Sequence, residues 1–139
     1  MPTPKPPQLK SIINNSYSNI SNYKVACIVK MKDGKIFKGV NVENPSFKDG
    51  MCAEQVAIGT AISEGYKKGD FETIYIMVGT NNISDLKYLD EYVITEFFEP
   101  EKTVVIYTLD EESRVLKVGN LYNNIYYCSI IFYITNNFN

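Results

Sequence analysis

The sequence predicts a single α/β domain in which helices pack on a mixed β-sheet. A hydrophobic content of 45% and a charged content of 22% over 139 residues are typical of one globular domain with its own core. Strand-like apolar segments alternate with segments whose apolar residues recur at helical spacing. The dipeptide Asp33-Gly34 separates two of the strand-like segments and predicts a β-hairpin. The expected order is helix, hairpin, helix, strand, helix, strand, strand.

The first half of the chain supplies the hairpin. Residues 1–7 are proline-rich, and we expect a mobile N-terminus there. A short helix is expected over 8–15, where apolar residues are spaced by three and four. The apolar run 23–31 reads as a strand, and residues 35–43 should return beside it in the antiparallel direction.

The second half alternates helices with strands. A helix should begin at Met51, after the chain breakers Pro45 and Asp49-Gly50, and end near Gly65. Ser84 is a candidate N-cap for a helix that carries an apolar face as far as Phe97. The three remaining apolar segments are expected to be strands, over residues 71–80, 103–108 and 114–118.

Composition excludes several classes of function. A net charge of −2 and a pI near 5.2 argue against binding to a nucleic acid polymer, which needs clustered cations. There is no histidine, which excludes a histidine-based catalytic triad and a histidine-ligated metal. Three cysteines lack the even count of a disulfide framework and fit a reducing compartment. With no signal peptide visible at the N-terminus, we expect a cytoplasmic protein.

The tail over 120–139 differs in character from the rest. Its apolar run is about half of the roughly 20 residues that a helix needs to span a bilayer, so we expect no membrane segment. We expect this aromatic tail to pack on the domain or to face another subunit.

Two short patterns carry candidate chemistry. Cys52 and Glu54 open the second predicted helix, where the positive end of the helix dipole favours a thiolate. A small buried cysteine beside an ordinary first-turn acid is the plain alternative. Asn41 and Glu43 alternate at the end of a predicted strand, which places both on one side. A strand-end turn is the plain reading of this pattern.

The patterns occur together with neighbouring segments that suggest a family. These are Tyr-Lys-Val-Ala at 23–26, the run from Asp33-Gly34 to Asn-Val-Glu-Asn at 41–44, Cys-Ala-Glu at 52–54, and Ala-Ile-Ser-Glu-Gly at 61–65. The combination resembles the small homotetrameric cytidine deaminases, which share their frame with the blasticidin deaminases. The resemblance covers residues 8–119.

The resemblance implies a three-layer α/β/α sandwich around a mixed, mainly five-stranded sheet. It also implies a homo-oligomer, a tetramer or a dimer, with a pocket for a pyrimidine nucleoside, cytidine or deoxycytidine. Asn41 and Glu43 would bind the ribose hydroxyls and Tyr23 would lie against the nucleoside. The backbone at Ala53 would touch the base. The implied activity is that of a hydrolase acting on a cyclic amidine, in pyrimidine salvage.

The resemblance also implies a catalytic zinc ion. Cys52 would be one metal ligand and Glu54 the catalytic proton shuttle. The family completes its zinc site with Pro-Cys-x-x-Cys, which this chain lacks. The ungapped alignment places Leu86 at the proline, Lys87 at the first cysteine and Asp90 at the second.

Three hypotheses follow. The first is a family protein that keeps the nucleoside pocket but has a degenerate zinc site, with zinc absent or weakly bound, a Lys87 ammonium in place of the metal charge, and deamination weak or lost. The second is an active cytidine deaminase that converts cytidine to uridine with an unusual ligand set of Cys52, Asp90 and Asp85. The third is a non-catalytic structural subunit of an oligomer.

Overall fold

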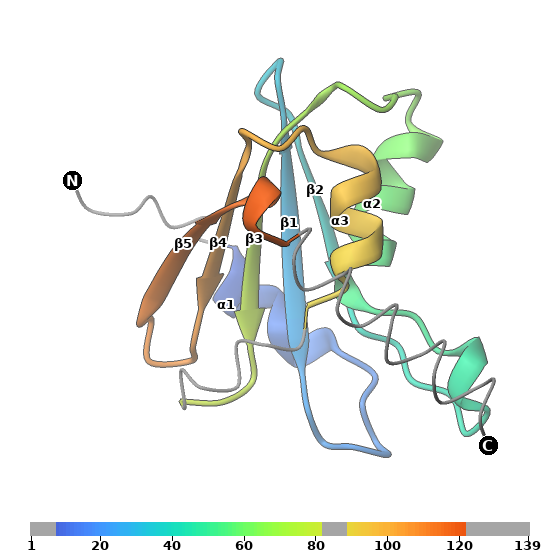
Figure 1. Ribbon diagram of the computed structural model, residues 1–139. Helices are drawn as coiled ribbons and strands as arrows, with labels where there is room; N and C mark the ends of the chain where they lie inside the picture. Colours follow the sequence, from blue (N-terminus) through green and yellow to red (C-terminus); the bar gives the residue numbers. More distant parts are fainter. Residues whose placement is uncertain (1–7, 82–88, 122–139) are drawn as a thin grey trace, which may run out of the picture.

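A five-stranded mixed sheet forms the centre of the molecule. The computed structural model describes residues 8–81 and 89–121, and the strand order is β2-β1-β3-β4-β5 (Figure 1). β3 and β4 are parallel and the other neighbouring pairs are antiparallel, so the predicted mixed sheet is confirmed. The strands are β1 Val25–Met31, β2 Ile36–Val40, β3 Phe71–Val78, β4 Thr103–Tyr107 and β5 Ser113–Lys117.

The hairpin of β1 and β2 closes at the predicted Asp-Gly turn. Gly34 has a φ of 94° and its amide donates to the carbonyl of Met31 at 2.9 Å. That positive φ is one that glycine adopts at little cost. Lys30 then faces Ile36 across the pair. The predicted hairpin is confirmed, and β2 ends at Val40 rather than continuing to residue 43.

Helices cover both faces of the sheet and make a three-layer sandwich (Figure 1). α1, Leu9–Ile12, continues into the 3₁₀ helix η1, Ile13–Asn15, and packs on β1 and β3. α2, Ala53–Ser63, and α3, Glu91–Phe97, lie on the other face (Figure 1). The first predicted helix is therefore confirmed as a short α-helix followed by a 3₁₀ turn, and the predicted layering is confirmed.

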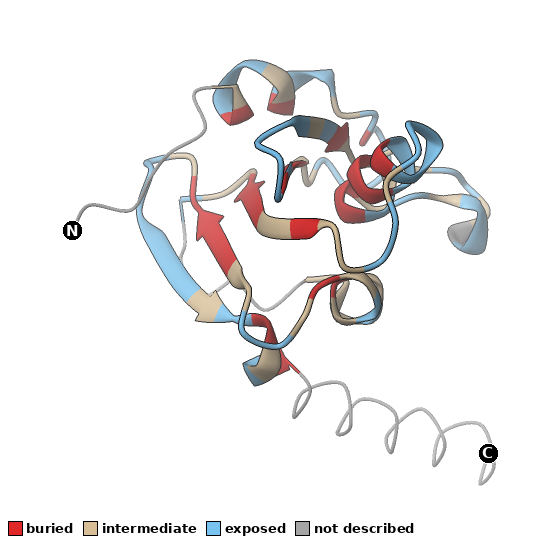
Figure 2. Cartoon of the chain, turned by 90° about the horizontal axis from the view of Figure 1, so that it is seen from above, coloured by how far each residue is buried: buried red, intermediate tan, exposed pale blue. Residues whose placement is uncertain are grey.

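Successive side chains of β1 point to opposite faces of the sheet and so enter two different apolar cores. Cys27 and Val29 belong to the core under α2, whereas Ala26 and Ile28 belong to the core under α1. Cys27 has no exposed surface, so it is a core residue of the sheet. At the sheet edge, β5 stays largely exposed (Figure 2).

A glycine brings α2 into backbone contact with β2. A Cβ atom added to Gly39 would lie 2.4 Å from the amide nitrogen of Ala57 and 2.5 Å from the carbonyl oxygen of Ala53. Both atoms belong to the helix backbone and cannot rotate away. The absence of a side chain at position 39 therefore fixes where the N-terminus of α2 sits.

One predicted helix start is wrong, and a second predicted helix is not continuous. α2 begins at Ala53 because Met51 forms a β-bridge with Val42, and Cys52 is extended, with φ −80° and ψ 158°. α3 begins at Glu91, while Leu89 and Asp90, which the prediction placed inside the helix, are not helical. Asp90 is the N-cap of α3, because its side chain accepts the amide of Val93.

Some predictions concern parts outside the described residues. These are the mobile N-terminus 1–7, the N-cap at Ser84, the lysine at position 87, and the tail beyond residue 121. Within 8–81 and 89–121, none of the helices has the length and apolar character needed to cross a membrane.

Candidate functional site

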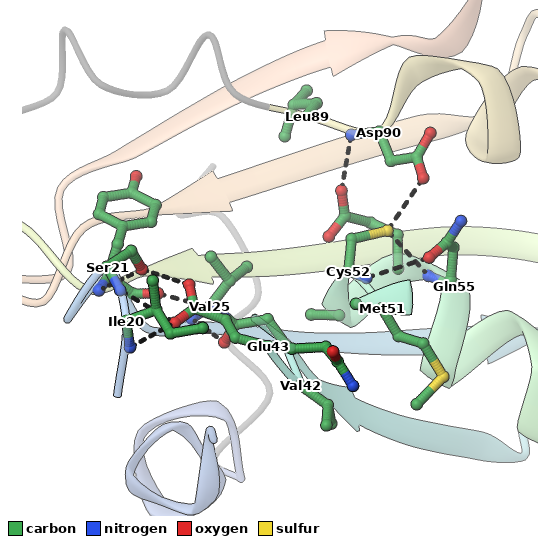
Figure 3. A pocket seen from close by; sticks show the side chains of 16 residues that line it. Ile20, Ser21, Val25, Val42, Glu43, Met51, Cys52, Gln55, Leu89 and Asp90 are labelled. Carbon is green, nitrogen blue, oxygen red and sulfur yellow. Dashed lines mark hydrogen bonds between the residues drawn. The ribbon is translucent and has the colours of Figure 1, made fainter. Parts of the chain in front are cut away.

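A cavity of about 920 Å³ opens beside the N-termini of α2 and α3 (Figure 3). Its walls come from the loop before β1, the segment after β2, the start of α2 and the residues just before α3. Lys87 and Asp85 lie outside the described residues, and the structure places the other predicted site residues in this wall: Tyr23, Asn41, Glu43, Cys52, Ala53, Glu54 and Asp90.

Cys52 is the N-cap of α2 and forms a capping box with Gln55. The Gln55 amide donates to the sulfur of Cys52 at 3.4 Å, and the Cys52 amide donates to Oε1 of Gln55 at 3.1 Å. The two contacts satisfy orphan donors of the helix start. Sequence reasoning missed this role of Gln55, although the spacing of a small side chain and a glutamine three residues later is a capping signal.

Asp90 joins the two helix N-termini. The Cys52 thiol donates to Oδ2 of Asp90 at 2.9 Å (Figure 3). Oδ1 of Asp90 accepts the amide of Val93 at 3.3 Å and so caps α3. The Asp90 amide donates to Oε2 of Glu54 at 2.7 Å. One residue of the α3 side thus contacts both the cysteine and the glutamate of the Cys-Ala-Glu motif.

The surroundings of Cys52 favour its protonated thiol. Burial is the largest cause that raises the pKa of Cys52, followed by the charge of Glu54 and the hydrogen bond to Asp90. In this arrangement these effects oppose the positive end of the helix and favour the neutral thiol. Burial also raises the pKa of Glu54 to about 7, since only 2% of this residue is exposed.

The described residues do not fit a three-ligand zinc centre. Zinc sites that catalyse hydrolysis hold the metal with three protein ligands and leave one position for water. Only two ligand-type side chains of the family positions meet here, Cys52 and Asp90, and they hydrogen-bond to each other. Among residues 8–81 and 89–121, no three histidine, cysteine, aspartate or glutamate side chains are grouped to hold a metal ion.

The Asn41 side chain forms hydrogen bonds with the backbone at the start of β1 and in the loop before it. Its Oδ1 accepts the amide of Val25 at 2.9 Å and the hydroxyl of Ser16, and its Nδ2 donates to the carbonyl of Tyr23 at 2.8 Å. The side chain therefore holds the loop before β1 against the end of β2. The predicted strand alternation does not position it, because β2 has already ended at Val40.

Glu43 anchors the same loop from the other side of Val42. Oε1 accepts the amides of Ile20 and Ser21, each at 3.0 Å, and Oε2 accepts the Ser21 hydroxyl (Figure 3). These donors lower the pKa of the carboxyl, with the Ser21 hydroxyl as the largest cause. Sequence reasoning missed Ser21, because nothing local marks a serine whose partner is 22 residues away.

Tyr23 and Ala53 complete the wall at the two ends of the cavity. Tyr23 is half-buried and packs against the core under α2. Ala53 is buried in the first turn of α2, directly after the capping cysteine. The arrangement sets an aromatic ring and two polar side chains at one end, and a backbone turn with a buried carboxyl group at the other.

Comparison with known proteins identifies the family. The sequence profile of the cytidine and deoxycytidylate deaminase zinc-binding region matches residues 8–82, more than half of the chain. The chain belongs to the cytidine deaminase family. The predicted resemblance and the predicted α/β fold are thereby confirmed.

Relatives and solved structures agree with this assignment. The chain is 37% identical over 78 residues to a cytidine deaminase of Mycoplasma genitalium, covering 56% of the chain and 58% of that protein. It is 33% identical over 69 residues to a cytidine deaminase of Mycoplasma pneumoniae, covering 49% and 51%. The match thus spans little more than half of these relatives. The crystal structure of cytidine deaminase from Burkholderia pseudomallei superposes with a TM-score of 0.71 at 31% identity, covering 81% of this chain and 89% of that one.

Proposed function

We propose that this protein binds a pyrimidine nucleoside, cytidine or deoxycytidine, and that its hydrolytic deamination is weak or lost. The observation that carries the proposal is the hydrogen bond between Cys52 and Asp90 at the wall of the cavity. Two side chains at the family's metal-ligand positions satisfy each other, and the cavity beside them keeps the polar residues that suit a nucleoside.

The two ends of the cavity suit the two parts of a nucleoside. Asn41 and Glu43 bind sugar hydroxyls, and Tyr23 lies against the nucleoside from the same end. At the other end the backbone at Ala53 contacts the base, and Glu54 faces its reactive edge. A cavity with an aromatic wall and a few converging polar groups is typical of small-molecule sites.

The proposal of weak deamination rests on the small number of candidate zinc ligands, Cys52 and Asp90. In this family the bound zinc ion, when present, acidifies a water molecule that attacks the base. Two protein ligands hold zinc less well than three, so we propose that the metal is absent or weakly bound. Lys87, which lies outside the described residues, would supply positive charge near Cys52 and Glu54 in place of the metal.

The second candidate function is an active cytidine deaminase. The contact between Cys52 and Asp90 favours it, because both side chains could ligate one metal ion if a third ligand completed the set. Asp85, outside the described residues, is the sequence's candidate for that ligand. The names of the Mycoplasma relatives also support this candidate.

The two candidates differ in metal content and turnover. We propose to measure zinc per chain by mass spectrometry and the ultraviolet change on adding cytidine or deoxycytidine. Thermal stabilisation by either nucleoside, with little zinc and little turnover, supports the main proposal. About one zinc per chain with rapid turnover contradicts it and establishes an active deaminase. Neither binding nor turnover would indicate a structural subunit.

Assembly and compartment are part of the proposal. We expect a homo-oligomer, a tetramer or a dimer, in the reducing environment of the cytoplasm. Sedimentation analysis of the purified protein tests the first expectation, because a tetramer of this chain has four times the monomer mass of 15.8 kDa.

A further inference from the structure

The loop before β1 is fastened to Glu43 by three neutral donors, and Ser21 supplies two of them. The Ser21 amide lies 3.0 Å from Oε1, and the Ser21 hydroxyl donates to Oε2 (Figure 3). The third donor is the amide of Ile20, also on Oε1. Ser21 itself is exposed, so its hydrogen bonds fix the position of the carboxylate more than they stabilise the fold.

The same serine hydroxyl also orients Tyr23. Its oxygen accepts the amide of Tyr23 at 3.0 Å, while the Tyr23 carbonyl accepts Nδ2 of Asn41 at 2.8 Å. Asn22 adopts a φ of 59° between them, which bends the chain and allows the short Ser21 to Tyr23 contact. Ser21 therefore links the carboxylate and the aromatic residue at this end of the cavity.

The hydrogen bonds described above leave one acceptor position open on Glu43 and one N–H open on Asn41. A carboxylate offers about four acceptor positions. Oε1 of Glu43 uses two, and Oε2 uses one on Ser21, which leaves one on Oε2. The carbonyl oxygen of the Asn41 amide takes two donors and its nitrogen gives one hydrogen to Tyr23, which leaves one N–H. Both residues line the cavity, so these two groups are available to a hydroxyl group of a ligand.

We propose that Ser21 is a positioning residue that aims the free acceptor of Glu43 at a sugar hydroxyl, so that the cavity selects nucleosides with a hydroxylated sugar. The inference rests on the proposed function and adds the residue that sets its sugar specificity. Without the Ser21 hydroxyl, Oε2 gains a second open position and loses the contact that holds it, while the amides of Ile20 and Ser21 still bind Oε1. The base end of the cavity does not depend on this contact.

The test compares two ligands on three variants of the full chain. Cytidine carries the sugar hydroxyls, and 2′,3′-dideoxycytidine lacks both at the ring. We expect Ser21→Ala to weaken cytidine binding by roughly three- to tenfold, as for the loss of one well-placed hydrogen bond, and to leave dideoxycytidine binding unchanged. Ser21→Thr, which keeps the hydroxyl, should bind cytidine like the parent protein.

The matched control is Ser63→Ala. Ser63 is an exposed serine whose hydroxyl donates to the carbonyl of Gly59 in the last turn of α2. Its removal should change neither affinity. Binding is measured by calorimetry or by ligand-induced NMR shifts.

The outcomes separate this inference from the proposed function. Equal affinity of the parent and Ser21→Ala for cytidine, or an equal loss for both ligands, overturns the role of Ser21. The same holds if Ser21→Thr loses as much affinity as Ser21→Ala. Failure of the parent protein to bind either ligand overturns the proposed function itself.

An acid titration gives an independent readout. The Ser21 hydroxyl is the largest cause that lowers the pKa of Glu43, so Ser21→Ala should move the acid limit of cytidine binding to higher pH. The other titratable side chains of the described cavity wall are Tyr23, Cys52, Glu54 and Asp90, and they are present in both proteins. An unchanged acid limit would contradict the inference.

Discussion

Asp90 connects the start of α2 with the start of α3 through three hydrogen bonds. It accepts the thiol of Cys52, caps the amide of Val93 and presents its own amide to Glu54. The Asp90 carboxylate therefore already accepts hydrogen bonds from two neutral donors, the Cys52 thiol and the Val93 amide. The half-buried Asp90 carboxylate and the Cys52 thiol can lie together at low cost because each has a hydrogen-bond partner.

Removing the Asp90 side chain should destabilise the protein. Asp90→Ala loses the cap of α3 and the acceptor of Cys52, which together should lower the free energy of unfolding by about 1–2 kcal/mol. Urea denaturation measures the change. Glu96→Ala is the control on the same helix, since Glu96 makes only an exposed ion pair with Lys68 at 3.5 Å. A loss no larger than in the control would show that the Asp90 contacts contribute nothing.

The lowered pKa of Glu43 should make the stability of the protein depend on pH. The folded pKa of this carboxyl lies below the ordinary 4.5 because of the donors from Ser21 and Ile20. Such a lowered acid contributes stability above its unfolded pKa, and this contribution is lost as the pH falls through the folded value. Glu43→Gln should therefore be less stable than the parent near neutral pH, and the difference should shrink as the pH falls below 4.5. A difference that stays constant into acid would contradict the assignment.

At the scale of the elements, the contact of β2 with α2 determines where the site is built. Gly39 lets the backbone of the strand meet the first turns of the helix, and Cys52, Ala53 and Glu54 stand at that junction. A shift of α2 would move the cysteine away from Asp90. The position of the site thus depends on a residue that has no side chain.

Gly39→Ala should be strongly destabilising. The added methyl group would lie 2.4 Å from a helix amide nitrogen, and overpacking of this kind costs about 1–3 kcal/mol or more. Gly59→Ala is the matched control in α2, because a Cβ there meets nothing within 4 Å. It should stabilise the protein by about 0.5–1 kcal/mol, since alanine is the better helix former. Equal effects of the two substitutions in urea denaturation would contradict the close contact.

Features that depend on local sequence could be predicted, whereas features that depend on tertiary contacts could not. The Asp-Gly turn and the apolar period of β1 are local signals, and both led to the observed hairpin. The start of α2 was placed too early because Met51 is an ordinary helix former, and its bridge to Val42 depends on tertiary pairing. The contact of Ser21 with Glu43 joins residues 22 apart and leaves no local pattern.

At the scale of the whole molecule, the fold brings four separate segments to one cavity. The loop before β1, the end of β2, the start of α2 and the approach to α3 meet at one side of the sheet (Figure 1). Family motifs mark three of those segments, and the ungapped alignment to the missing Pro-Cys-x-x-Cys motif placed Asp90 in the fourth. The hydrogen bonds among them required the three-dimensional structure.

A calorimetric titration of cytidine into the full chain, after treatment with a chelator and removal of metal, tests whether the cavity binds a pyrimidine nucleoside without a complete zinc centre. We expect saturable binding that added zinc leaves unchanged. Binding that is absent in the metal-free protein and appears only when zinc is restored would contradict it.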